Sequence, residues 1–226
     1  MNKILKLSAI ALLASSTSLM AQSKNFAGAS IGISGSMAGV EVEGNTTDSS
    51  SATTGSGSFG KITPVPSLDV NYGFEAGSNF VFGLGASYIP AKVEFGTNAF
   101  TDTTNSQRDA VKGEIKDVYS IYITPTYVIN NNSALYAKVG YIHGDLNLTT
   151  ASSNIVFTKK PSDVEGWSVG IGSKTMLTNN LYLTVEGNYT EFDSITATTT
   201  DSESNTNTSS ATPKVAQAII GIGYKF

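Results

Sequence analysis

The stretch "AIIGIGYKF", residues 218–226, carries its apolar side chains at every second position. Ala218, Ile220, Ile222, Tyr224 and Phe226 share one parity, and glycine or lysine occupies the other from residue 221 onward. Because successive side chains of a β-strand point to opposite faces, this period of two predicts a strand with one apolar face. The same alternation recurs in three other stretches, at residues 80–88, 135–141 and 181–189.

Eight segments of this kind follow one another along the chain, at residues 25–34, 62–74, 80–93, 115–129, 134–148, 165–177, 181–193 and 215–226. Tight polar turns, "EAGSN" (75–79), "NNNS" (130–133) and "TNN" (178–180), alternate strictly with four long connections rich in Ser, Thr, Asn and Gly. In an up-and-down barrel every tight turn then lies at one end and every long loop at the other. We therefore predict an all-β fold, an antiparallel up-and-down β-barrel of eight strands.

The first residues predict export from the cytoplasm. Lys3 and Lys6 precede an apolar run from Leu7 to Leu13, and small residues lead to Ala21. This is the pattern of a secretory signal peptide, so we expect a signal at residues 1–21 and a barrel domain at residues 22–226.

Composition excludes several classes of protein. The chain has no cysteine, so it has no disulfide, thiolate nucleophile or acylated cysteine of a lipoprotein. Its net charge is −4 and no basic stripe is present, which argues against a nucleic-acid partner. Charged residues are only 14% of the chain, fewer than a water-exposed surface normally needs.

A soluble, lipocalin-like barrel is the structural rival of a membrane barrel. Small Gly and Ser residues dominate the non-apolar face, which suits a narrow interior better than a surface in water. Aromatic residues on the apolar face recur eight residues apart, which spans about 20 Å of membrane normal at about 3.3 Å per residue and a tilt of about 40°. Membrane barrels carry two such aromatic girdles. We expect a lower girdle of Phe74, Phe80, Tyr127, Tyr224 and Phe226, and an upper girdle of Tyr88, Tyr119, Tyr141, Trp167 and Tyr189.

Two places in the predicted strands are irregular. Pro125 lies within the fourth strand and lacks the N–H that a closed barrel needs, so we expect a bulge near the lower rim. In the first strand the apolar parity shifts across "SGSMAG" (34–39), which indicates a second bulge or a bend.

The final strand resembles that of small outer-membrane barrels of the OmpA, OmpX and opacity-protein type, which end on Phe with an aromatic residue two positions earlier. Tyr224 and Phe226 match that ending. The resemblance implies a Gram-negative outer-membrane location in contact with membrane lipids. It also implies that Tyr224 and Phe226 form a signal read by the outer-membrane assembly machinery.

The inward parity places four charged residues in the lumen: Asp69, Lys138, Lys174 and Glu186. Buried charges must pair or be hydrated. We interpret the four as a structural ion network, with a gate for a narrow ion path as the alternative.

No catalytic, cofactor-binding or metal-binding residue is predicted. Outer-membrane lipid A deacylases use a His and a Ser two residues apart, whereas "YIHGDL" places Asp145 after His143, the one histidine. The sequence thus favours a non-enzymatic surface protein whose hydrophilic loops contact the environment, other cells or phage. A narrow ion or small-solute channel is the first alternative, and a lipid-modifying enzyme is the second.

Overall fold

A computed structural model describes residues 23–48, 62–101, 108–150, 155–201 and 206–226, so the predicted signal peptide lies outside the described residues. Within these ranges the chain forms one short 3-10 helix and eleven strands. They are η1 (Ser23–Asn25), β1 (Gly28–Asp48), β2 (Ile62–Glu75), β3 (Phe80–Ile89), β4 (Val93–Thr101), β5 (Arg108–Val128), β6 (Ser133–Thr150), β7 (Ile155–Lys159), β8 (Asp163–Met176), β9 (Leu181–Phe192), β10 (Ile195–Asp201) and β11 (Thr206–Lys225).

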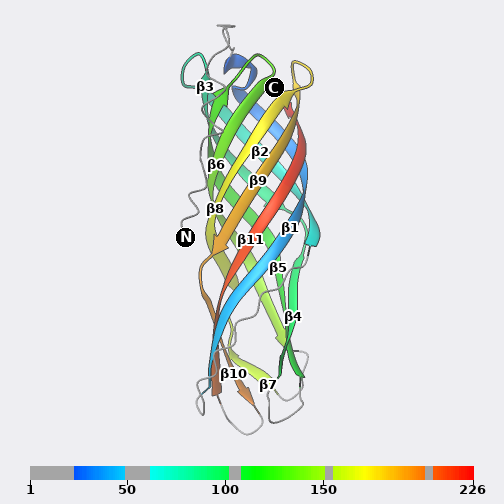
Figure 1. Cartoon of the computed structure of the whole chain (residues 1–226), viewed down its shortest axis with the longest axis vertical. Helices are drawn as coiled ribbons and strands as arrows, with labels where there is room; N and C mark the ends of the chain where they lie inside the picture. Colours follow the sequence, from blue (N-terminus) through cyan, green and yellow to red (C-terminus); the bar gives the residue numbers. More distant parts are fainter. Residues whose placement is uncertain (1–22, 49–61, 102–107, 151–154, 202–205) are drawn as a thin grey trace, which may run out of the picture.

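Eight of these strands close into a barrel (Figure 1). Neighbours pair in the order β1-β2-β3-β5-β6-β8-β9-β11, and β11 returns to β1 in a ladder that runs from Ser30↔Lys225 to Asp48↔Asn207. All of these pairings are antiparallel, which confirms the predicted eight-stranded up-and-down barrel. Among the described residues, no helix has the length and apolar character needed to cross a membrane.

The two ends of the barrel differ as the turn lengths predict. The three tight turns, helix η1 and the C-terminus gather at one end, drawn at the top of Figure 1. At the opposite end β1, β5 and β11 continue far beyond the predicted strands, and β4, β7 and β10 are added.

Parts of the segments that were predicted to be long loops form strands instead. Residues 195–201, "ITATTTD", form β10, which pairs with β11 on one side and with β7 on the other. Strand β4 pairs with the first half of β5. Threonine and isoleucine are β-branched and favour strands where a neighbouring edge is available, so these polar segments extend the wall.

Neither of the two expected bulges is present. The ladder of β5 with β3 pairs Phe82 with Pro125 without a shift, and the register with β6 is the same before and after Pro125. The register shift of β5 lies farther from the tight turns than Pro125 does, between Lys116 and Tyr119, where Asp117 has a φ of 50°. Strand β1 keeps one register with both neighbours throughout "SGSMAG".

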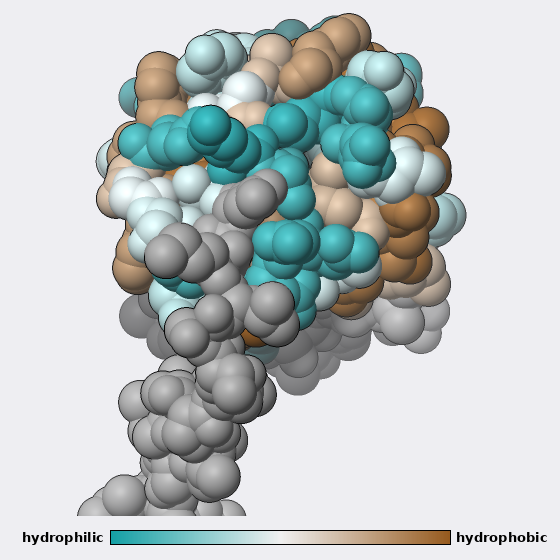
Figure 2. Space-filling view, turned by 90° about the horizontal axis from the view of Figure 1, so that it is seen from above, coloured by the Kyte–Doolittle hydropathy of each residue, from teal (hydrophilic) through white to brown (hydrophobic). Residues whose placement is uncertain are grey.

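The outer face of the wall carries the apolar residues. Phe80 and Tyr127 are register partners of the lower girdle, and Tyr88 and Tyr119 are register partners eight residues higher. All four side chains are exposed. Figure 2, a view onto the end with the tight turns, shows hydrophilic residues on that end and hydrophobic residues along the sides.

Candidate functional site

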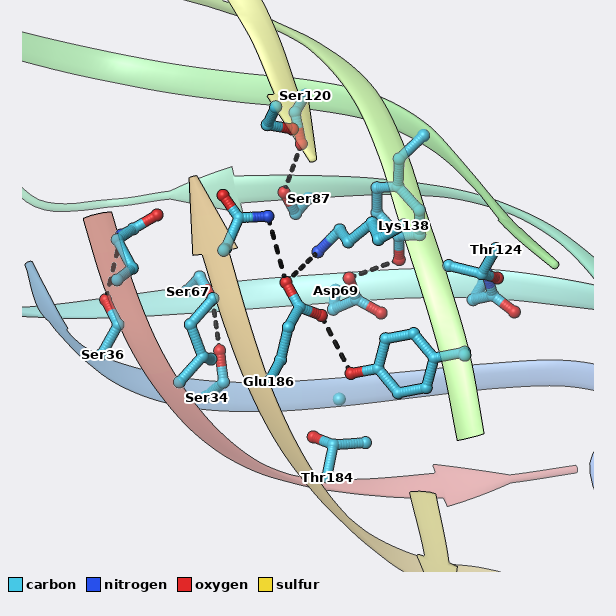
Figure 3. Close-up of a pocket in the computed structure, with 18 of the residues that line it drawn as sticks. Ser34, Ser36, Ser67, Asp69, Ser87, Ser120, Thr124, Lys138, Thr184 and Glu186 are labelled. Atoms are coloured by element: carbon cyan, nitrogen blue, oxygen red, sulfur yellow. Dashed lines mark hydrogen bonds and ion pairs between the residues drawn. The ribbon is translucent and has the colours of Figure 1, made fainter. Parts of the chain in front are cut away.

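The centre of the barrel interior holds a polar network around Glu186, whose side chain is 7% exposed. Its carboxylate accepts hydrogen bonds from the Tyr136 hydroxyl at 2.9 Å, from Asn188 Nδ2 at 3.3 Å and from Lys138 Nζ at 3.4 Å. Figure 3 shows Lys138 reaching Glu186 across the lumen. Strand β9 supplies Glu186 and β6 supplies Lys138 and Tyr136, so the network joins two strands that are not neighbours.

Asp69 on β2 forms the second half of the network. Its carboxylate accepts a hydrogen bond from the Tyr122 hydroxyl of β5. The Lys138 ammonium lies 4.3 Å from the centre of the Tyr122 ring, which links Asp69 to Glu186 through one tyrosine and one lysine. The ammonium of Lys174 lies 4.5 Å from the centre of the Tyr182 ring. The structure therefore places all four predicted charges in the lumen, with Lys138 rather than Lys174 contacting Glu186.

Three inward tyrosines each lie across from a glycine on the neighbouring strand. The register pairs are Gly85↔Tyr122, Tyr136↔Gly172 and Gly223↔Tyr182. A Cβ added at any of these glycines would meet the ring of its tyrosine at 2.2–2.6 Å, which is closer than two atoms can approach. The glycines are therefore required because each tyrosine ring lies over its partner strand, so that the Tyr122 hydroxyl reaches Asp69 on β2 and the Tyr136 hydroxyl reaches Glu186 on β9.

Hydroxyl pairs and a small cavity lie beside the charges. Ser34 Oγ lies 2.6 Å from Ser67 Oγ, and Ser87 Oγ lies 2.7 Å from Ser120 Oγ (Figure 3). The cavity of about 130 Å³ between these side chains has room for a few water molecules, each of which takes about 30 Å³ in the liquid.

Apolar side chains close over this polar band at both ends. At the end with the tight turns, the segment after η1 crosses the mouth of the barrel and contributes to one cluster, which contains Phe26, Ala27, Val81, Val128, Ala134, Met176 and Tyr182. At the other end, inward residues of β5, β6, β8 and β9 form a second cluster, which contains Ile115, Val118, Leu146, Leu148, Val164 and Phe192. The described lumen is thus a polar layer between two apolar layers.

The charges of the polar layer are compensated within the layer itself. Two carboxylates and two ammonium groups balance in charge, and the buried Glu186 has several hydrogen-bond donors. His143 has outward parity, on the opposite side of the wall from the inward, buried Ser120 and Ser168. A hydroxyl nucleophile needs a base within hydrogen-bond reach, and these serines cannot reach the chain's one histidine.

Sequence reasoning missed the three tyrosines that carry much of the network. Tyr122, Tyr136 and Tyr182 share the inward parity with glycines and serines, and a large aromatic residue on a small-residue face was the available signal. The two residues of the predicted assembly signal lie elsewhere, at the end of β11 on the outer face. Tyr224 and Phe226 are 46% and 73% exposed, and their rings make an edge-to-face contact at 5.2 Å.

The closed barrel, its apolar outer face and its filled polar interior together define a transmembrane β-barrel. A family model of the outer membrane protein beta-barrel domain matches residues 9–226, and the chain belongs to this family. The family places the chain in the bacterial outer membrane. No curated protein matches the chain in sequence.

Solved structures share the fold at low sequence identity. The outer membrane protein OprG from Pseudomonas aeruginosa matches at 14% identity and a TM-score of 0.57, with 88% of this chain and 96% of that chain covered. The outer membrane protease OmpT from Escherichia coli matches at 13% identity and a TM-score of 0.53, with the same coverages. Ail, the attachment invasion locus protein of Yersinia pestis, matches at 17% identity and a TM-score of 0.47, over 88% of this chain and 99% of that one. At such identities the likenesses to OprG and OmpT extend to the fold alone.

Proposed function

We propose that this barrel is a non-enzymatic surface protein whose extracellular strand extension and loops contact other cells or phage. The observation that carries the proposal is the outer face of β10 and β11 beyond the membrane part of the wall. The even-numbered positions from 194 to 200 and from 206 to 212 are all threonine or serine, and we call them the hydroxyl face: Ser194, Thr196, Thr198, Thr200, Thr206, Thr208, Ser210 and Thr212.

The hydroxyl face is ordered by its strand pairing. Thr196↔Ser210, Thr198↔Thr208 and Thr200↔Thr206 are successive same-face rungs of one antiparallel ladder. Hydrogen bonds join further hydroxyls at its edges, with Ser194 Oγ 3.1 Å from Ser210 Oγ and Thr158 Oγ1 2.8 Å from Thr200 Oγ1. Uncharged hydroxyl groups both donate and accept hydrogen bonds, so a fixed array of them suits a polar partner such as a glycan-covered surface.

The interior supports a role outside the lumen. An eight-stranded barrel is just wide enough for side chains to fill, and the apolar clusters lie above and below the polar layer. Ion flow would have to pass both clusters. The narrow channel remains the alternative, because the cavity beside Asp69 and Glu186 is polar and holds room for water.

Two further proposals follow from the placement of the chain ends and of the histidine. Tyr224 and Phe226 serve as the signal for the assembly machinery, since both rings are presented on the outer face at the end of β11. A lipid-modifying activity is disfavoured because Asp145, and not a serine, lies two residues after His143, so that position offers the imidazole no hydroxyl nucleophile.

Cells that produce the chain should sediment together, or adsorb phage, faster than cells that lack it. The double variant Thr198→Glu/Thr208→Glu places like charges on one rung and should abolish the gain at unchanged outer-membrane yield. Its matched control, Ala76→Glu in an exposed tight turn, should keep the gain. An ion conductance of the refolded chain in planar bilayers, with no cell-contact phenotype, would support the channel instead.

A further inference from the structure

A group of metal-ligating side chains lies on the outer wall, separate from the lumen. His143 of β6 and Asp163 and Glu165 of β8 offer one imidazole nitrogen and two carboxylate oxygens that all lie within 4.8 Å of one another. His143 Nδ1 and Glu165 Oε1 are 3.3 Å apart. We infer that His143, Asp163 and Glu165 form a binding site for a divalent cation of the zinc or manganese type.

Strand pairing makes this arrangement a fixed part of the wall. His143 and Glu165 are register partners, and Asp163 lies two residues before Glu165 on the same face of β8. The ring of His143 also lies 5.0 Å from the ring of Tyr119, its register partner on β5. Three adjacent strands thus orient the imidazole.

The site lies directly beyond the upper girdle. Tyr141 and Trp167 are register partners with ring centres 5.8 Å apart, and each lies two residues from the site on its own strand, on the membrane side. Two residues of a tilted strand rise by about 5 Å, so the site lies in the headgroup layer above the aromatic belt. A cation held there faces outward, where water or a phosphate oxygen can complete its coordination.

The ligand set and its spacing match a borderline divalent metal. One imidazole with two carboxylates leaves a coordination position open, as zinc sites with three protein ligands do. Bonds of about 2.0–2.2 Å arranged tetrahedrally place ligand atoms about 3.3–3.6 Å apart. The distance between His143 Nδ1 and Glu165 Oε1 is 3.3 Å, and the exposed Asp163 needs only a side-chain rotation to join them.

The charge of the surroundings distinguishes this group from an ordinary surface ion pair. Asp145 is the register partner of Asp163, and the Asp193 N–H donates to the carbonyl of Glu165 at 2.7 Å. The carboxylates of Asp145, Asp163 and Glu165 therefore share one face with the imidazole and with Lys116, the register partner of Asp145, so acidic groups are in excess there. A dication binds neutral imidazole and carboxylates together, and it offsets two negative charges at once.

The test uses the full chain, refolded in detergent without a histidine tag, and titrated with Zn²⁺. We expect one Zn²⁺ per chain, and a Co²⁺ complex with visible absorption as a spectroscopic signature of the same site. His143→Ala and Glu165→Gln should each weaken binding by more than about tenfold, because losing a ligand costs at least as much as losing its supporting group. Glu191→Gln, an exposed acid on the neighbouring strand, is the matched control and should leave binding unchanged.

Three outcomes would overturn the site. Zn²⁺ binding that survives both His143→Ala and Glu165→Gln would assign the ion to another part of the surface. Equal competition by Ca²⁺, with no effect of His143→Ala, would mean that carboxylates alone attract cations. No binding at 0.1 mM Zn²⁺, which is about one hundred times the Kd of a micromolar site, would leave His143 and Glu165 a simple ion pair.

Discussion

Strand β11 passes through two regions of the molecule in one unbroken register, yet its two faces exchange character between them. In the membrane part the outward residues are apolar, as at Ile220 and Ile222, and the inward residues are small, as at Gly221. In the extension the outward residues carry hydroxyl groups, as at Thr208, and the inward Val215 packs against the second apolar cluster, which contains Ile115 and Phe192. The fold is the same in both regions, whereas the solvent outside the wall is not.

This exchange explains why the parity shift in β1 looked like a bulge. Ile31 and Ile33 are 47% and 58% exposed, on the lipid side, while Ala38 and Val40 are buried inside the extension. The apolar residues change faces because lipid surrounds the part of the barrel nearer the tight turns, whereas water surrounds the extension. A period-two pattern therefore locates a strand reliably, but a change of parity marks either a bulge or a change of medium.

The largest expected effect is all-or-none labelling of the two ends. The chain has no cysteine, so single cysteines are clean probes. Thr206→Cys in the extension should react with a membrane-impermeant maleimide on intact cells, and Ala76→Cys in a tight turn should react only after the cells are broken. Both positions are exposed. Labelling of Ala76→Cys alone on intact cells would invert the proposed orientation.

The next largest effect is expected when a lysine is placed on the outer face of β11, either in the membrane part or in the extension. Ile220 lies midway between the girdle residues of β11 and of its neighbour, so Ile220→Lys should destabilise the barrel by about 2–4 kcal/mol in lipid. Thr208→Lys on the hydroxyl face should change stability by less than about 0.5 kcal/mol. Urea unfolding in lipid vesicles measures both. Equal losses would mean that lipid surrounds the extension too.

The features that could be predicted are those that depend on short stretches of sequence. The eight barrel strands, the closure of β1 on β11 and the outward aromatics follow from period two and turn length, which are local. The added strands β4, β7 and β10 could not be predicted, because a Thr-rich segment becomes a strand only where a partner edge is offered. The cluster of His143 with Glu165 was missed for a similar reason, since only the β6–β8 register joins residues that far apart.

A further prediction concerns the inner face of the membrane part, where Glu186 lies in the lumen network. Glu186→Ala leaves Tyr136, Lys138 and Asn188 without their acceptor, and should destabilise the barrel by roughly 1–3 kcal/mol. The control Glu191→Ala removes an exposed carboxylate of the same strand, and should cost less than about 1 kcal/mol. Unfolding midpoints in detergent compare the two. An unchanged midpoint for Glu186→Ala would mean that water replaces the lost carboxylate, and a rise in conductance would favour the gate.

A small effect on stability is expected at Phe226, which lies at the end of the membrane part farthest from the extension. Its ring is 73% exposed at the lower rim and touches only Tyr224 among the aromatic rings of the described residues. A charge near the membrane interface costs about 0–1 kcal/mol, so Phe226→Asp should barely change the unfolding of refolded protein. Phe74→Asp is the matched control, because Phe74 is an equally outward residue of the lower girdle on another strand.

If Phe226 is read by the assembly machinery, the two variants should separate in cells although they agree in detergent. Phe226→Asp should lower the outer-membrane yield of the heat-modifiable, folded form, while Phe74→Asp keeps it. The reason is that a signal acts on the chain before insertion, when β11 has not yet paired with β1, whereas a girdle residue acts only in the inserted barrel. Unchanged yields of both variants would reduce Phe226 to an ordinary girdle residue. Equal losses of yield in both variants would show that any charge at this rim impairs insertion.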